Sequence, residues 1–208
     1  MPLKEYWRKR TFDRTPEPRG AESPPLPGSL RRFVVGRHRA TRLHYDLRLE
    51  IGGVLVSWAL PRGPSMEPLT KRRAARTEDH PLEYLDFEGI IPRGEYGGGD
   101  AIVWDNGSWD PELDEDPAES IANGELKLIM HGQRLSGRYA FVRTGFEGGK
   151  EDWQLIRKRE GAVEGWDNDD YRTTVLTGRT NEEVPDRVPG DVMPGRSLAD
   201  IDQSAARP

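Results

Sequence analysis

Hydrophobic and polar positions alternate along much of the chain between residues 33 and 157. The clearest stretch places Leu43, Tyr45, Leu47, Leu49 and Ile51 on one side and His44, Asp46, Arg48 and Glu50 on the other. Alternation with a period of two is typical of a β-strand with one apolar and one polar face. The Gly52-Gly53 pair predicts a turn, and residues 54–60 then form the returning strand of a hairpin.

Further short segments with the same alternation follow, separated by Gly, Pro and Asn. They cover residues 101–109, 125–130, 139–143 and 153–157. No long segment with a period of 3.6 residues competes with them. An antiparallel barrel or a strongly curved sandwich fits this pattern, because closure leaves few open edges among so many short strands. We therefore predict a mainly β protein, a compact antiparallel β-barrel with Pro/Gly-rich loops and polar terminal extensions.

Composition divides the chain into three parts. Residues 1–30 are rich in proline and poor in apolar residues, which predicts an extended N-terminal arm with a short anchor at residues 3–7. Residues 31–160 hold the predicted barrel. Residues 161–208 are acidic and contain only scattered apolar residues, which predicts a disordered or loosely docked C-terminal tail.

Composition also excludes several classes of function. The chain has no cysteine, so a disulfide framework, a thiolate metal site and a cysteine nucleophile are excluded. No apolar run approaches the roughly 18 residues of a membrane span, and we expect a cytoplasmic protein without a membrane partner. The net charge is -5, but residues 1–42 are rich in Lys and Arg. A basic segment favours a polyanionic ligand.

The polar face of the first hairpin carries the first candidate chemistry. His44, Asp46 and Arg48 follow one another about 7 Å apart along the strand, and His38 lies six residues upstream. Two imidazoles and a carboxylate suit Mn²⁺, Fe²⁺ or Zn²⁺. The alternative is a strand face with ion pairs and two surface histidines.

His80 and two arginines extend this set. Arg48, Arg62 and Arg72 lie around the histidines in sequence, and arginine binds phosphate through two parallel hydrogen bonds. Several cations around one metal describe a phosphoryl site. We expect His131, which precedes Gly132 at the end of a strand, to be an ordinary structural residue.

A different enzyme class could use some of the same residues. His44, Asp46 and a distal His131 imitate the two-histidine, one-carboxylate triad of Fe(II) oxygenases. Such an enzyme needs a single cation for the carboxylate of its cosubstrate. Three arginines and a second upstream histidine fit phosphate better.

Longer motifs then give a family resemblance. HxATRLHYDLRLE, GVLVSWALPRGPS, KRRA, EDHPLEYLDFEGIIPRGEYGGG and AIVWDNGSW follow one another in this order. Together they strongly resemble the 3′-phosphoesterase domain of bacterial and archaeal ligase D, over about residues 8–160. The family fold is a compact β-barrel, and the family trims DNA ends in non-homologous end joining.

The resemblance implies roles for ten residues. It implies a catalytic Mn²⁺ bound by His38, His44 and Asp46. It implies scissile-phosphate contacts from Arg48, His80 and Tyr84, further basic residues at Arg62 and Arg72, and substrate-binding positions at Arg10 and Glu17. Two positions depart from the family pattern, because Thr11 stands where aspartate is usual and Gly36 where glutamine is usual. These departures concern substrate positioning and the support of the metal ligands. We therefore expect removal of a 3′-ribonucleoside, the diesterase step, to be weaker than hydrolysis of a 3′-phosphate, the monoesterase step.

The implied reaction has two stages. A 3′-terminal ribonucleoside is removed to leave a 3′-phosphate, and that phosphate is then hydrolysed to a 3′-OH. The implied partners are DNA 3′ ends, with Ku, a separate ATP-dependent ligase and a polymerase as further candidates. We expect a stand-alone, nucleoid-associated form of the domain. The alternative from another class is a catalytically weak module that binds DNA ends and recruits repair partners.

Overall fold

The structure is a computed structural model that describes residues 2–21, 30–147 and 150–184. Its strands are β1 (Arg32–Arg39), β2 (Leu43–Ile51), β3 (Val54–Leu60), β4 (Lys71–Arg76), β5 (Gly89–Ile91), β6 (Gly99–Pro111), β7 (Glu125–Gly132), β8 (Ser136–Glu147) and β9 (Lys150–Arg157). Its helices are α1 (Lys4–Arg8) and α2 (Pro117–Asn123), with 3-10 turns η1 (Leu82–Asp86), η2 (Asn168–Asp170) and η3 (Asn181–Glu183).

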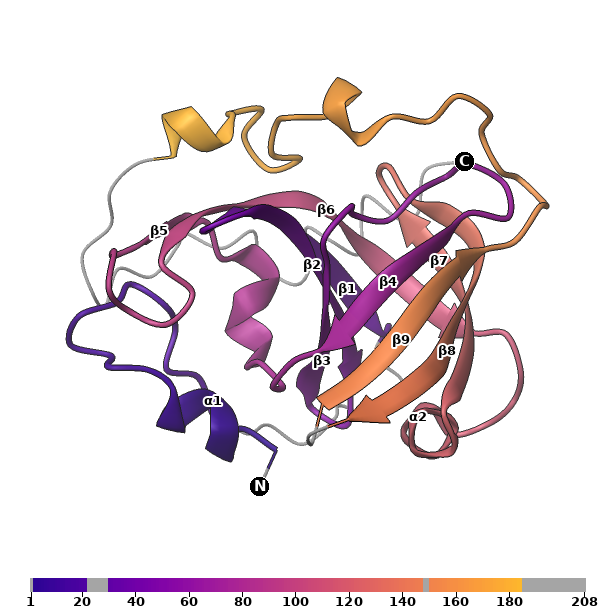
Figure 1. Ribbon diagram of the computed structural model, residues 1–208, viewed down its shortest axis with the longest axis horizontal. Coiled ribbons are helices and arrows are strands. Elements are labelled where there is room, and N and C mark those ends of the chain that lie inside the picture. The colour runs from indigo at the N-terminus through magenta and orange to yellow at the C-terminus, as the bar shows by residue number, and fades with distance from the viewer. Residues whose placement is uncertain (1, 22–29, 148–149, 185–208) are drawn as a thin grey trace.

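The strands form one antiparallel sheet that closes on itself (Figure 1). Its order is β1-β2-β3-β4-β9-β8-β7-β6, and β6 pairs again with β1. β5 pairs with residues 99–101 of β6, of which Asp100 and Ala101 also pair with β1. The predicted antiparallel β-barrel is therefore confirmed.

Large aromatic side chains fill the inside of the barrel. Trp58, Trp109 and Trp153 are fully buried, and Trp58 stacks on Phe141 with ring centroids 4.3 Å apart. The apolar face of β2 contributes Leu47 and its neighbours to the same core. As the alternation in the sequence predicts, the apolar face of β2 points into the barrel and its polar face points outward.

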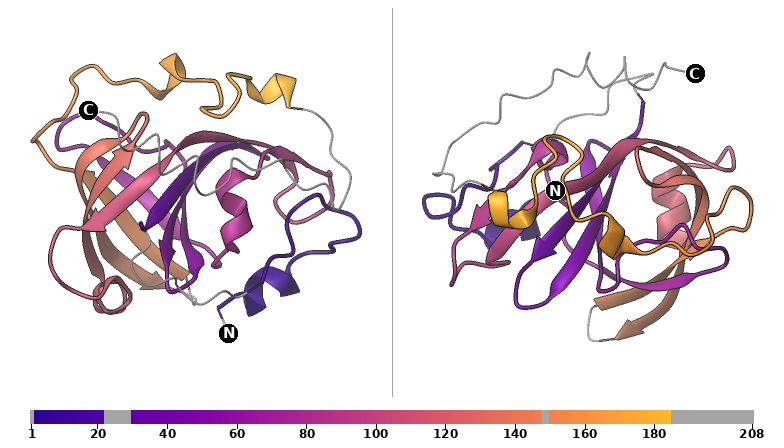
Figure 2. Two further views of the ribbon diagram at one scale, coloured as in Figure 1. Left: turned by 180° about the vertical axis from the view of Figure 1, so that it is seen from behind. Right: turned by 90° about the horizontal axis from the view of Figure 1, so that it is seen from above.

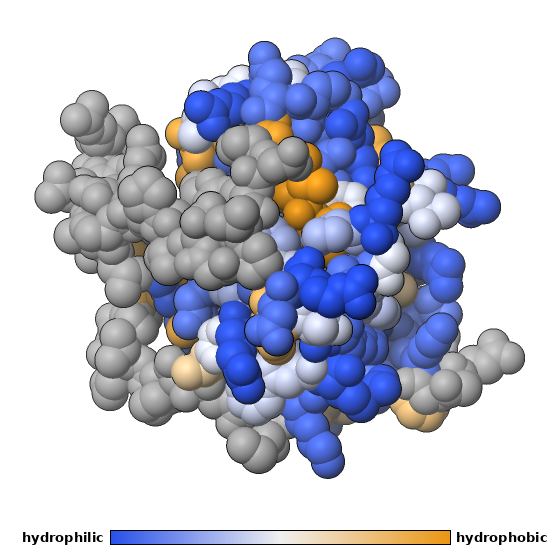
Figure 3. Space-filling view, turned by 90° about the vertical axis from the view of Figure 1, so that its left-hand side faces the viewer, coloured by the Kyte–Doolittle hydropathy of each residue, from blue (hydrophilic) through white to orange (hydrophobic). Residues whose placement is uncertain are grey.

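The polar face of β2 is covered by other parts of the chain. His80, just before η1, forms a β-bridge with Leu55 of β3, and its ring meets Tyr6 of α1 at 5.2 Å between centroids. Arg48 is only 6% exposed as a result. The outer face of β1–β3 is therefore partly covered by the segment around His80 and by α1. The side of the molecule that carries α1 is otherwise largely hydrophilic (Figure 3).

The N-terminal arm is anchored more firmly than an extended arm would be. Leu3 and Tyr6 are fully buried, and the predicted anchor at residues 3–7 largely coincides with α1. The Tyr6 hydroxyl donates to the carbonyl of Pro18 at 2.5 Å, which folds the arm back on itself. Residues 22–29 of the predicted arm lie outside the described residues.

Residues 161–184, the first half of the predicted tail, dock on the barrel. This segment runs across one end of the barrel (Figures 1 and 2). Trp166 stacks on Tyr171 at 4.5 Å, and Thr174 and Asn181 are each 2% exposed. Composition left the choice between a disordered and a docked segment open, because a few aromatic and hydrogen-bonding anchors suffice to hold a polar segment. Residues 185–208 of the predicted tail lie outside the described part of the chain.

The end of this segment is fastened to β1 and β6. Asn181 accepts a hydrogen bond from Arg37 Nη1 at 2.5 Å and donates to Asp100 Oδ1 at 2.7 Å. Arg37 lies next to His38 in β1. The segment therefore supports the strand that carries one of the candidate metal ligands.

Helices are few and short in the described residues. None of them is long and apolar enough to cross a membrane.

These contacts predict that residues 161–184 contribute to stability. We compare a chain that ends at residue 160 with one that ends at residue 184. Losing the Trp166–Tyr171 stack and the buried Thr174 and Asn181 should cost at least about 3 kcal/mol, which lowers Tm by roughly 6–12 °C in a protein of this size. Differential scanning calorimetry measures the difference. Equal Tm values for the two chains would mean that the docked segment adds nothing to the barrel.

Candidate active site

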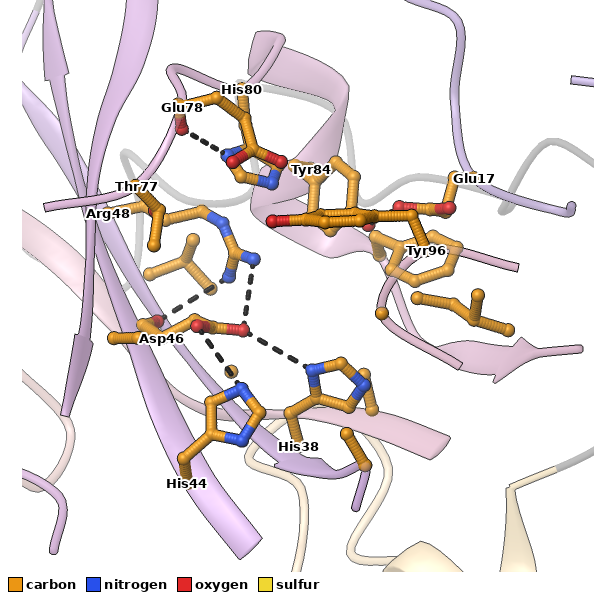
Figure 4. Close-up of a pocket in the computed structure, with 18 of the residues that line it drawn as sticks. Glu17, His38, His44, Asp46, Arg48, Thr77, Glu78, His80, Tyr84 and Tyr96 are labelled. Carbon is orange, nitrogen blue, oxygen red and sulfur yellow. Dashed lines mark hydrogen bonds and ion pairs between the residues drawn. The ribbon is translucent and has the colours of Figure 1, made fainter. Parts of the chain in front are cut away.

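The pairing of β1 with β2 places three candidate ligands side by side. His38 lies opposite His44, and Gly36 lies opposite Asp46, so the three side chains share the outer face of the hairpin. One ligand atom from each of His38, His44 and Asp46 lies within 4.8 Å of the others. Figure 4 shows the two imidazoles and the carboxylate turned toward one another.

The distances within this trio are longer than hydrogen bonds. His38 Nδ1 is 3.5 Å from Asp46 Oδ2, and His44 Nε2 is 3.6 Å from Asp46 Oδ1. His44 Nδ1 faces the carbonyl of Arg42 at 3.0 Å, so it carries the proton and leaves Nε2 with a free lone pair. His38 Nε2 is buried without a hydrogen-bond partner among the described residues. The donor set therefore fits a divalent transition metal.

Asp46 is held in its charged form. Burial opposes ionisation, but the positive charge of Arg48 and the two imidazoles outweigh it and hold the pKa of Asp46 well below its usual range. Arg48 Nη2 donates to Asp46 Oδ2 at 3.2 Å, and its guanidinium lies 4.7 Å from the centre of the Tyr84 ring. An ionised carboxylate is the form that binds a metal.

His80 sits behind this cluster as a neutral base. Arg10 Nη2 is 3.2 Å from His80 Nε2, and because arginine only donates, Nε2 accepts. The proton is therefore on Nδ1, which faces the carbonyl of Glu78 at 2.9 Å. Burial and the charges of Arg48 and Arg10 hold the pKa of His80 well below its usual range. In this arrangement His80 has no proton to donate into the cavity.

The N-terminal arm brings two of the predicted residues into the site. Arg10 Nε donates to Glu17 Oε1 at 2.8 Å, and Arg10 Nη1 donates to Glu78 Oε1 at 2.9 Å. The Tyr84 hydroxyl also donates to Glu17. Burial raises the pKa of Tyr84 well above its usual range, so it remains a phenol. Arg10 is thus fixed on three sides, by two carboxylates and by His80.

These groups line one cavity of about 270 Å³. Its ionised lining consists of two arginines, Arg10 and Arg48, and three carboxylates, Glu17, Asp46 and Glu78. The carboxylates thus outnumber the arginines by one, and Lys9 pairs with one of them, Glu78. A divalent cation bound at the trio would make the cavity positive and able to hold an anion.

Eight of the ten sequence-predicted residues line this cavity. They are Arg10, Glu17, His38, His44, Asp46, Arg48, His80 and Tyr84. Arg62 and Arg72 do not line it. They are neighbours of each other, and burial together with the charge of Arg62 lowers the pKa of Arg72. The two positions that depart from the family pattern also separate, since Gly36 lines the cavity and Thr11 is exposed outside it.

The oxygenase triad does not assemble. His131 is exposed and lies 3.1 Å from Asp110 Oδ2, and it is not part of the cavity that holds His44 and Asp46. The distal histidine of that alternative is therefore not available to the metal trio.

Sequence reasoning missed two residues of the cavity. Glu78 binds Arg10 and Lys9, and Tyr96 lies at the cavity mouth. The signal for Glu78 was its place two residues before His80, and both side chains contact Arg10. Tyr96 stands between two positive-φ glycines, Gly94 and Gly97, which marks a tight loop beside the site.

The fold and the cavity define a class before any comparison is made. This is a closed β-barrel protein with a candidate metal centre in a cavity lined by arginines and carboxylates. Residues 36–143 match the family model described as the DNA Ligase D 3′-phosphoesterase domain. The chain belongs to this family.

Three relatives are similar over most of the chain. The multifunctional non-homologous end joining protein LigD of Pseudomonas aeruginosa is 48% identical over 186 residues, which cover 89% of this chain and 21% of that protein. The LigD proteins of Mycolicibacterium smegmatis and Mycobacterium tuberculosis are 45% and 47% identical, over 68% of this chain and 19% and 18% of theirs. The chain thus spans about a fifth of the length of these relatives.

The lowered pKa of His80 predicts a pH-dependent stability. Below about pH 6.5 the unfolded chain protonates this histidine and the folded protein does not, so the unfolded state binds more protons and stability falls as pH falls. The contribution is up to about 1.4 kcal/mol per pH unit. Urea unfolding at pH 7, 6 and 5 should therefore show a shallower loss in His80→Gln than in the parent.

The surface variant His131→Gln is the matched control for this experiment. If parent and His80→Gln lost stability at the same rate between pH 6 and 5, His80 would not be the buried neutral base described above.

Proposed function

We propose that this protein is a metal-dependent phosphoesterase that processes DNA 3′ ends. The observation that carries the proposal is the charge of the cavity. Its three carboxylates outnumber its two arginines, and a trio of metal-ligand type lies on its floor. A divalent cation at the trio would let this cavity hold a phosphate. Membership of the LigD 3′-phosphoesterase family supports the same reaction class.

His38, His44 and Asp46 would hold the cation, and Mn²⁺ is the proposed ion because imidazole and carboxylate ligands suit it. When bound, it would supply a Lewis acid for a phosphoryl oxygen and a site for an activated water. Arg48 keeps Asp46 ionised, and its Nη1 and Nη2 face the Asp46 carbonyl and carboxylate at 3.5 and 3.2 Å. It is placed to neutralise negative charge that develops on the phosphoryl oxygens.

The remaining residues position the catalytic groups. His80 is neutral and its Nε2 accepts from Arg10, so we assign it the role of a support for Arg10 in place of a proton donor. Glu17 and Glu78 hold Arg10 at the cavity wall. Tyr84 is a phenol close to both Arg48 and Glu17. Arg62 and Arg72, outside the cavity, would contact a more distant part of the substrate.

The proposed substrates are DNA primer ends that carry a 3′-ribonucleotide or a 3′-phosphate. The first stage removes the ribonucleoside and leaves a 3′-phosphate, and the second hydrolyses that phosphate to a 3′-OH. Relatives named for non-homologous end joining support a place in that repair route. Ku, a separate ATP-dependent ligase and a polymerase are the proposed partners, in the nucleoid of the cytoplasm.

A DNA-end-binding module remains a second candidate, favoured by one observation. Arg10 and Arg48 are each already paired with a carboxylate, which leaves little free positive charge for catalysis in the absence of a cation. The assay below separates the two functions.

We predict that Asp46→Asn abolishes both stages, with a loss of at least about 100-fold. The variant keeps the shape of the side chain and removes the charge that binds the cation. Losing a hydrogen-bond partner of a metal ligand already costs about 10- to 100-fold in metal affinity or activity, and losing a ligand itself should cost at least as much. The assay is gel electrophoresis of a primer-template with one 3′-ribonucleotide, incubated with Mn²⁺ or EDTA.

His131→Asn, a surface substitution outside the cavity, is the control and should keep parental rates. Near-normal turnover by Asp46→Asn would contradict the metal assignment. Binding of the primer-template without turnover by the parent protein would favour the end-binding module.

Gly36 should influence the balance of the two stages. A Cβ at this position would lie 3.2 Å from Arg48 Nη1, whose present acceptor, the Asp46 carbonyl, is 3.5 Å away. A glutamine here would require a shift of a few tenths of an ångström in a flexible side chain and would offer Arg48 a better acceptor. We expect Gly36→Gln to raise the rate on a 3′-ribonucleotide end about fivefold relative to a 3′-phosphate end, within the range of one positioning hydrogen bond.

Thr11→Asp, at the exposed departure from the family pattern, is the companion variant. Side-by-side rates on the two ends measure the ratio. An unchanged ratio in both variants, together with equal parental rates on the two ends, would show that neither departure weakens the first stage.

A further inference from the structure

Tyr96 is an exposed aromatic residue at the mouth of the cavity. Its side chain is 48% exposed, although large apolar and aromatic residues of this barrel are mostly buried. Among the large exposed hydrophobic residues in the described part of the chain, it is the one that lines the cavity. Nothing in the packing of the core requires it there.

A tight loop fixes the position of this ring. The backbone N–H of Glu95 donates to Pro92 at 3.2 Å, and that of Gly98 donates to Glu95 at 3.1 Å. Gly97 has a φ of +77° and lies so close to the metal trio that a Cβ there would be 3.8 Å from His38 Cε1. The loop that carries Tyr96 therefore borders the candidate metal centre directly.

Two cations hold the ring. Lys9 Nζ is 3.3 Å from the Tyr96 hydroxyl and 4.8 Å from the ring centre, and the Arg10 guanidinium is 5.6 Å from the ring centre. In Figure 4 the ring is seen edge-on, with its hydroxyl directed inward and the trio of His38, His44 and Asp46 on the other side of the cavity. A flat aromatic face thus stands across the cavity from the place proposed for the phosphate.

We infer that Tyr96 is a stacking platform for the 3′-terminal nucleoside of the DNA strand. The inference rests on the proposed function, which assigns residues to the reacting phosphate but none to the terminal nucleoside. In the first stage the group attached to the reacting phosphate is a ribonucleoside, whose base lies within one nucleotide of that phosphate. An aromatic ring beside the phosphate position is placed to meet this base.

Stacking also sets the chemistry of recognition. Every base offers a flat π-face, so an aromatic platform binds nucleosides with little preference for sequence. The 3′-phosphate end that enters the second stage has no nucleoside beyond its phosphate. Tyr96 therefore acts on the first stage much more than on the second.

Fluorescence of a terminal base tests the contact without turnover. The probe is a primer-template whose 3′-terminal ribonucleoside is 2-aminopurine joined through a methylenephosphonate linkage that cannot be cleaved, mixed with the protein and Mn²⁺. We expect the parent and Tyr96→Phe, which keeps the ring, to quench the emission of the bound probe, and Tyr96→Ala to leave it unquenched. Phe146→Ala, which removes another exposed aromatic residue outside the cavity lining, is the matched control and should quench like the parent.

Kinetics on the two ends give the second measurement. Base–aromatic stacking predicts that Tyr96→Ala lowers kcat/KM on a 3′-ribonucleotide end about 5- to 100-fold more than on a 3′-phosphate end. Tyr96→Phe should retain the parental ratio within about twofold. An equal loss on both ends, or a loss in Tyr96→Phe as large as in Tyr96→Ala, would overturn the stacking role.

The two measurements also separate this inference from the proposed function. If the parent cleaves neither end, but the parent and Tyr96→Phe quench the probe and Tyr96→Ala does not, the proposed reaction is wrong and the stacking role of Tyr96 stands. If the parent cleaves both ends and bound probe keeps its full emission, the platform is wrong and the reaction stands.

Discussion

The site depends on one largely buried carboxylate whose charge must be balanced. Asp46, with a side chain 15% exposed, lies among Arg48, His38 and His44, and these neighbours keep it ionised although burial opposes its charge. Two further carboxylates, Glu17 and Glu78, line the cavity, so carboxylates outnumber the two arginines there. This excess of carboxylates would favour a divalent cation at the trio.

The barrel supplies the rigidity that this arrangement needs. Two neighbouring strands, β1 and β2, carry all three members of the trio in fixed register. Segments outside the barrel complete the cavity, because α1 and the following arm bring in Arg10 and Glu17. The segment 161–184 lies outside the family match at residues 36–143, yet Asn181 holds the end of β1 next to His38. The candidate site is therefore the product of the whole described chain.

Periodicity predicted the barrel and the hairpin because each strand has one apolar face, as Leu47 and Leu49 show. The motifs named eight residues that do meet in one cavity. Composition left open whether residues 161–184 are disordered or docked, because docking depends on a few contacts such as the stack of Trp166 on Tyr171. The proton position on His80 was equally hidden, since it follows from a long-range contact with Arg10. Arg62 and Arg72 were grouped with the site by sequence proximity, whereas the fold directs them elsewhere.

The central claim is that the His–His–Asp trio binds a divalent metal. Anomalous diffraction at the manganese edge, from crystals of this protein grown with Mn²⁺, tests it most directly. The account predicts a strong peak within about 2–2.4 Å of ligand atoms from His38, His44 and Asp46. A well-ordered cavity without a peak at the trio, or Mn²⁺ bound only at surface carboxylates, would contradict it.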